Sequence, residues 1–132
     1  MRKIEHIGIA VRDLDESEKL FSLLLGAEPY KREHVESQEV MTSFFRLGNN
    51  KIELLQATSE QSVITKFLDK KGPGFHHVAY AVGDIRKEMK RLKEQGFQLL
   101  NEGPVKGADN KIVCFLHPRD TNGILIELVQ EA

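Results

Sequence analysis

A repeated segment constrains the fold of this chain more than any other feature of its sequence. Residues 6–14 (HIGIAVRDL) return as residues 77–85 (HVAYAVGDI), with His, Ala, Val and Asp at matching positions. The chain has 132 residues, which is the length of one ordinary domain. We therefore expect a single domain, residues 1–132, that was built by a tandem duplication.

The residues after each copy predict a helix. Asp13 precedes apolar positions at three- to four-residue spacing that end at Gly26, and Asp84 precedes a similar stretch that ends at Gly96. Aspartate caps the free amides at a helix N-terminus, and glycine is typical of a helix C-terminus. Glu16, three residues after Asp13, also resembles a capping box.

Each half continues with three predicted strands. They cover residues 29–35, 40–47 and 51–56 in the first half and residues 98–101, 111–116 and 124–130 in the second. Each half therefore has the order β-α-β-β-β. Residues 58–71 predict a helix between the halves, capped by Thr58 or Ser59, so we place module one at about 1–57 and module two at about 72–132.

Composition excludes several classes of protein. Nineteen Lys and Arg oppose 20 Asp and Glu, so the chain lacks the basic field that nucleic-acid binding requires. No window approaches the roughly 20 apolar residues of a membrane span, and residues 1–16 are unlike a signal peptide. A single cysteine, Cys114, lies in an apolar run typical of a core strand. We expect a cytoplasmic protein with no nucleic-acid or membrane partner.

Strand parity places one histidine of each repeat beside small side chains. Alternate residues of a strand share a face, so His6 lies with Gly8 and Ala10, and His77 lies with Ala79 and Ala81. The bulky alternate residues suit packing against the helix of the same module. A face with one imidazole and two very small side chains leaves room for a bound group.

The last predicted strand of each half carries a carboxylate within an apolar run. These are Glu53 in KIELL and Glu127 in ILIELV. A buried carboxylate needs a cation, a proton or solvent. Either each His is an ordinary hydrogen-bonded residue and each Glu is solvated, or the four form a site, and the repetition of the pair favours a site. Two imidazoles and two carboxylates suit Zn²⁺, Co²⁺, Ni²⁺, Mn²⁺ or Fe²⁺, and the lack of thiolates argues against a closed structural zinc site.

Three further histidines are weaker candidates. His76 is adjacent to His77 but points to the opposite face, so we do not expect it to be a ligand. His117 precedes Pro118 in a turn, where it either has a structural role or contacts substrate. His34 lies in a polar stretch and is expected to be exposed.

The motifs resemble the vicinal oxygen chelate superfamily, and within it the methylmalonyl-CoA epimerase family. The resemblance covers essentially the whole chain. Its more specific parts are the linker helix leading to Gly74-Phe75-His76-His77 and the turn Leu116-His117-Pro118. It implies an α+β fold in which two β-α-β-β-β modules form a curved mixed sheet around a metal site. It also implies His6, Glu53, His77 and Glu127 as ligands of a divalent metal ion, and a homodimer.

The resemblance further implies a reaction. Epimerases of this family remove the C2 proton of an acyl-CoA thioester and return it to the opposite face, with a metal ion stabilising the enolate. Glu127 is expected to be both ligand and base. Some members carry a second glutamate where this chain has Thr42, and threonine is no base at neutral pH. Glu39 replaces it only if a bulge shifts the strand register.

Substrate contacts and alternatives complete the predictions. His117 and Lys106 are candidate substrate-binding residues, although the segment around Lys106, residues 103–110, is also consistent with an ordinary solvated loop. One alternative function is a lactoylglutathione lyase of the glyoxalase I type. Another is a non-catalytic protein of the same fold that binds a small molecule, although such proteins commonly lose ligands that this chain retains.

Overall fold

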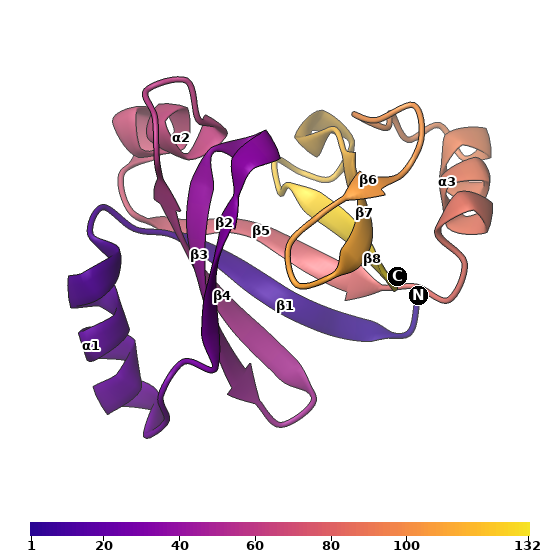
Figure 1. Ribbon diagram of the computed structural model, residues 1–132. Helices are drawn as coiled ribbons and strands as arrows, with labels where there is room; N and C mark the ends of the chain where they lie inside the picture. The colour runs from indigo at the N-terminus through magenta and orange to yellow at the C-terminus, as the bar shows by residue number, and fades with distance from the viewer. The chain divides into compact units, whose positions relative to one another are not determined.

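The computed structural model describes residues 1–132, which form two compact units. The middle unit is Ile7–His76, and the terminal unit combines Met1–His6 with His77–Ala132. The order of elements is β-α-β-β-β in each half, with helix α2 between the halves (Figure 1). The predicted duplication of the element order is confirmed, and the terminal unit contains the first residues of the chain as well as the second repeat.

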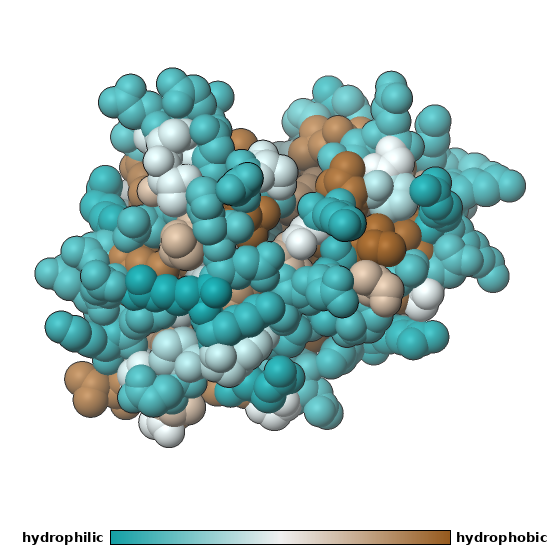
Figure 2. Space-filling view, viewed as in Figure 1, coloured by the Kyte–Doolittle hydropathy of each residue, from teal (hydrophilic) through white to brown (hydrophobic).

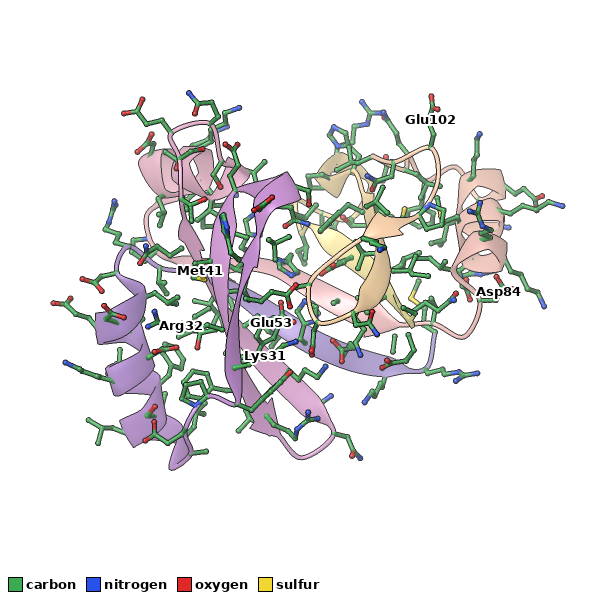
Figure 3. The ribbon with its side chains drawn as sticks, viewed as in Figure 1. Lys31, Arg32, Met41, Glu53, Asp84 and Glu102 are labelled. Atoms are coloured by element: carbon green, nitrogen blue, oxygen red, sulfur yellow. The ribbon has the colours of Figure 1, made fainter.

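The middle unit has an antiparallel sheet covered by a helix. Strands β2 (Lys31–Val35), β3 (Val40–Leu47) and β4 (Asn50–Ala57) pair in sequence order. Helix α1 (Leu14–Leu25) packs on one face of this sheet, where Leu14 and Phe21 meet Phe45 and Leu54 in a buried cluster. Arg32 ties β2 to α1 by donating hydrogen bonds to Asp15 and Glu18 (Figure 3).

Helix α1 begins and ends as its sequence predicts. The Asp13 carboxylate accepts a hydrogen bond from the backbone N–H of Glu16 at 3.1 Å. Gly26 ends the helix in the left-handed conformation, with φ of 67°, which costs glycine little because it has no Cβ. Asp84 caps α3 in the same way, by accepting from the N–H of Lys87.

Helix α2 covers Val63–Lys71 and therefore starts later than predicted. Ser62, not Thr58 or Ser59, is the N-cap and accepts a hydrogen bond from the N–H of Ile64 at 3.2 Å. Ser59 instead belongs to the preceding turn, where it accepts from Gln61 N–H. Several consecutive polar residues could each have capped this helix, so local sequence did not distinguish among them.

The terminal unit has a mixed sheet. Strand β5 (Gly74–Ala81) runs parallel to β8 (Ile126–Glu131) through its last four residues, and β7 (Lys111–Leu116) runs antiparallel to β8. Strand β1 (Lys3–Ala10) starts in this unit, where Arg2 N–H donates to the carbonyl of Ala81 at 2.8 Å.

Helix α3 (Ile85–Glu94) covers one face of this sheet. Ile85, Met89 and Leu92 of the helix pack against a cluster that includes Cys114 and Leu128. The bulky alternate residues of the second repeat pack against α3, as the sequence predicts. Cys114 is fully buried, as predicted, and burial raises the pKa of its thiol to about 11.

The strand predicted at residues 98–101 is wrong. Leu99 makes an isolated bridge to Leu116, but no ladder extends from it. Backbone N–H groups next to the bridge donate to side chains instead of to the opposite strand. Asp120 accepts from Gln98 N–H, and Asn101 accepts from Phe115 N–H. The missing strand is β6 (Val105–Lys106), which pairs with β7 inside the segment expected to be a loop.

The surface in view is mostly hydrophilic, with a hydrophobic group over the C-terminal half of α1 (Figure 2). Leu20, Leu23 and Leu24 of this helix are 61%, 85% and 70% exposed. No helix is both long enough and apolar enough to cross a membrane.

Candidate metal centre

Three predicted ligands meet inside the terminal unit. The Nε2 atoms of His6 and His77 are 3.0 Å apart, and the Oε1 atom of Glu127 is 3.1 Å from each of them. Each residue comes from a different strand, and all three are buried. The structure thus brings together three of the four residues that the repeat singled out.

The alternation of side chains along β5 and β8 explains this meeting. Ile126 and Leu128 point toward the α3 cluster, so Glu127 lies on the opposite face of the sheet. Ala79 is paired with Glu127 and shares that face, which places His77 two residues away on the same side. Ala79 is itself fully buried against Val113 and Val129, so protein atoms fill the space at this position.

The two imidazoles control the charge state of Glu127. Burial alone raises the pKa of a carboxyl group, because it disfavours the charged form. The contacts of Glu127 with His6 and His77 outweigh burial in the metal-free protein and lower the pKa of Glu127 to about 2. Glu127 is therefore ionised at neutral pH, which is the state that a metal ligand or a base requires.

The spacing of the three donor atoms fits a divalent metal ion. Donors at adjacent corners of an octahedron with metal–ligand bonds of about 2.1 Å lie about 3.0 Å apart. The three separations here are 3.0 and 3.1 Å. Two imidazole nitrogens and a carboxylate oxygen are also a donor set that first-row metals prefer.

A second carboxylate supports His6 and was missed by the sequence analysis. Glu5 is buried, and its Oε1 atom lies 2.7 Å from Nδ1 of His6. Strand parity places adjacent residues on opposite faces, so alternation along β1 does not predict a contact between Glu5 and His6. The available signal was an acidic residue directly beside a predicted histidine ligand, since such histidines usually hydrogen-bond to a carboxylate.

Glu53 belongs to the middle unit. It is buried on β4, opposite Phe44 of β3, on the sheet face away from α1. Lys31 of β2 lies in the same row across the sheet (Figure 3), with its Nζ 5.2 Å from the centre of the Phe44 ring. His6, His77 and Glu127 belong to the terminal unit, so the role of Glu53 as a metal ligand stays a prediction.

Thr42 shares this face with Glu53. It is paired with Leu55, two residues from Glu53 on β4, and is 1% exposed. Its Oγ1 atom has no hydrogen-bond partner within the protein. Glu39 does not take its place, because the pairing of β3 is continuous and Glu39 precedes the strand, where its carboxylate accepts from Ser59.

The remaining candidates lie as follows. His117 caps a short 3₁₀ helix (Pro118–Asp120) by accepting from Arg119 N–H at 3.2 Å, which is the structural role considered for it. Lys106 is an exposed residue of β6. His76 packs edge-on against Phe67, and His34 is exposed, both consistent with their exclusion as ligands.

Comparisons with known proteins identify close relatives. A family model described as the glyoxalase/bleomycin resistance protein/dioxygenase superfamily matches residues 5–115. The ethylmalonyl-CoA/methylmalonyl-CoA epimerase of Cereibacter sphaeroides is 42% identical over 130 residues, covering 97% of this chain and 97% of that protein.

Solved structures agree with the sequence comparison. A variant of Streptomyces coelicolor methylmalonyl-CoA epimerase in complex with 2-nitronate-propionyl-CoA has a TM-score of 0.96 at 33% identity, covering 100% of this chain and 96% of that one. Methylmalonyl-CoA epimerase from Mycobacterium tuberculosis has a TM-score of 0.95 at 36% identity, covering 98% and 88%. The predicted glyoxalase-like α+β fold is confirmed.

Proposed function

Since the chain belongs to the glyoxalase/bleomycin resistance protein/dioxygenase superfamily, we propose that it is a metal-dependent methylmalonyl-CoA epimerase. The observation that carries this proposal is the convergence of His6, His77 and Glu127 at 3.0 to 3.1 Å. The 42% identity to an epimerase supports the choice of reaction within the superfamily.

His6, His77 and Glu127 would hold a divalent metal ion, with Glu53 as the proposed fourth ligand. A metal ion bound there supplies Lewis acidity toward the negative charge that develops on the substrate oxygens. Co²⁺, Zn²⁺, Ni²⁺ and Mn²⁺ all suit these donors. Glu53 is proposed because it is the first repeat's counterpart of Glu127.

Glu127 is the proposed base. Its Oε1 atom faces the two imidazoles, which leaves Oε2 to take the proton from C2 of the substrate. An ionised carboxylate oxygen can accept that proton. The proton that returns to the opposite face of C2 comes from another group or from water, because the hydroxyl of Thr42 is too weakly acidic and basic for that role.

Thr42 has a different proposed role at the site, as a hydrogen-bond partner of a substrate oxygen. Its buried Oγ1 atom lacks a partner within the protein, and such a group costs about 1–3 kcal/mol when it stays unpaired. A hydroxyl group can donate to the carboxylate or thioester oxygen of the substrate. Lys106 and His117 remain proposed substrate-binding residues.

We further propose a cytoplasmic homodimer. The exposed Leu20, Leu23 and Leu24 of α1 supply an apolar surface that a two-fold partner would cover. Light scattering after gel filtration measures the mass directly. A mass of one chain at micromolar concentration would contradict the dimer.

The test of function is proton exchange at C2. Metal-loaded protein is mixed with methylmalonyl-CoA in D₂O, and deuterium uptake at C2 is followed by NMR. We expect uptake well above a metal-only control and none with E127Q. The hemithioacetal of methylglyoxal and glutathione is assayed in parallel. Turnover of that adduct without C2 exchange would replace the proposal by the lyase.

A further inference from the structure

Glu5 is a buried carboxylate with a specific partner. It is 6% exposed, and its Oε1 atom lies 2.7 Å from Nδ1 of His6, which is 4% exposed. Burying a carboxylate is costly unless hydrogen bonds or charges compensate for the lost solvation. The short contact with His6 provides such compensation, so the two side chains form one buried unit.

This contact favours one tautomer of His6. A carboxylate oxygen accepts hydrogen bonds, so an Nδ1–H group on His6 makes this 2.7 Å contact a hydrogen bond. A neutral imidazole has one N–H group, and the other nitrogen, Nε2, then presents a lone pair. That Nε2 atom is the one that lies 3.0 Å from His77 Nε2 and 3.1 Å from Glu127 Oε1.

We propose that Glu5 is a positioning residue of the metal centre, which holds His6 in the Nδ1–H tautomer with its Nε2 lone pair directed at the metal. This inference rests on the proposed metal-dependent function. A carboxylate behind a ligand histidine fixes the orientation of the ring and raises its basicity. Glu5 therefore acts on the metal through His6.

The duplication does not account for this carboxylate. The residue before His77 is His76, which packs edge-on against Phe67 with ring centres 5.1 Å apart. The two repeats thus share the ligand histidine but differ at the residue before it. Glu5 therefore has no acidic counterpart in the second repeat.

Metal affinity is the first test. Binding of Co²⁺ alone is measured by competition with a chromophoric chelator for the wild type, E5A, E5Q and E102Q. We expect E5A to raise the dissociation constant by about 10- to 100-fold. E5Q should have a smaller effect, because the amide oxygen still accepts from Nδ1–H. E102Q, at the exposed Glu102 of the same unit (Figure 3), is the charge-matched control and should match the wild type.

The tautomer of His6 is the second test. Imidazole ¹⁵N NMR of the metal-free wild-type protein should show hydrogen on Nδ1 of His6, and E5A should shift the ring toward the Nε2–H form. A loss of packing alone would not change the tautomer. Hydrogen on Nε2 alone in the wild type, or wild-type Co²⁺ affinity in folded E5A, would overturn the inference.

These tests separate the role of Glu5 from the function of the protein. If the wild type binds Co²⁺ and E5A binds it weakly, but methylmalonyl-CoA takes up no deuterium, the epimerase proposal fails and Glu5 keeps its role. If C2 exchange occurs and E5A equals the wild type in affinity and tautomer, the inference fails while the function stands.

Discussion

The Nε2 atoms of His6 and His77 lie 3.0 Å apart although 71 positions separate the two residues in the chain. The rings meet edge to face, at an interplanar angle of 87°. Either one Nε2 carries hydrogen and donates to the other, or a cation lies between the two lone pairs. The oxygen of Glu127, 3.1 Å from both nitrogens, adds negative charge to the same point. The arrangement therefore favours a bound cation.

Removing one imidazole should remove the metal. H77A takes away one of the three converging donors, so elemental analysis after metal loading should find strongly reduced content. H34A is the matched control, because His34 is exposed and lies in the other unit. Full metal retention by folded H77A would refute the ligand assignment.

Glu53 is tested by two substitutions of different chemistry. If its carboxylate binds the metal, E53Q keeps an oxygen donor and should weaken Co²⁺ affinity less than E53A does. Chelator competition measures both dissociation constants. Equal, wild-type affinity in both variants would show that Glu53 is buried for another reason.

Thr42 should be replaceable by valine without loss of stability. The two side chains have similar shape, and T42V removes a buried hydroxyl that has no partner within the protein. We expect the free energy of unfolding in urea to stay the same or rise, by at most about 2 kcal/mol. T42S keeps the hydroxyl and serves as the control. Epimerase KM should rise in T42V and stay near wild type in T42S, whereas an unchanged KM would contradict the proposed substrate contact.

Acid should weaken the link between α1 and β2. The pKa of Glu18 is lowered from its ordinary value of 4.5, mainly by the hydrogen bond from Arg32. A lowered carboxyl pKa contributes stability that is present above 4.5 and is lost as the pH falls toward the folded-state value. E18Q should therefore reduce the free energy of unfolding at pH 7, by at most about 1 kcal/mol, and less at lower pH. Urea unfolding at several pH values checks this, and a pH-independent difference would contradict it.

Local signals predicted the elements that depend on neighbouring residues. Asp13 and Gly26 bound α1 as expected, because a cap acts within one helical turn. Strands β3 and β7 have the predicted bounds. The strand predicted at 98–101 failed because Asp120 and Asn101 occupy backbone groups that a ladder would have used, and their approach depends on the folded chain.

The sequence by itself determined the duplication, both capped helices and the choice of His6, Glu53, His77 and Glu127 as candidate ligands, because repetition and alternation are properties of the chain alone. Only the tertiary structure decided that His6 joins the unit of residues 77–132, that Glu5 turns to Nδ1 of His6, and that the hydroxyl of Thr42 is buried without a partner. Those facts depend on which strands pair and on which side chains are in contact in the folded protein. Sequence periodicity does not encode such contacts between distant residues.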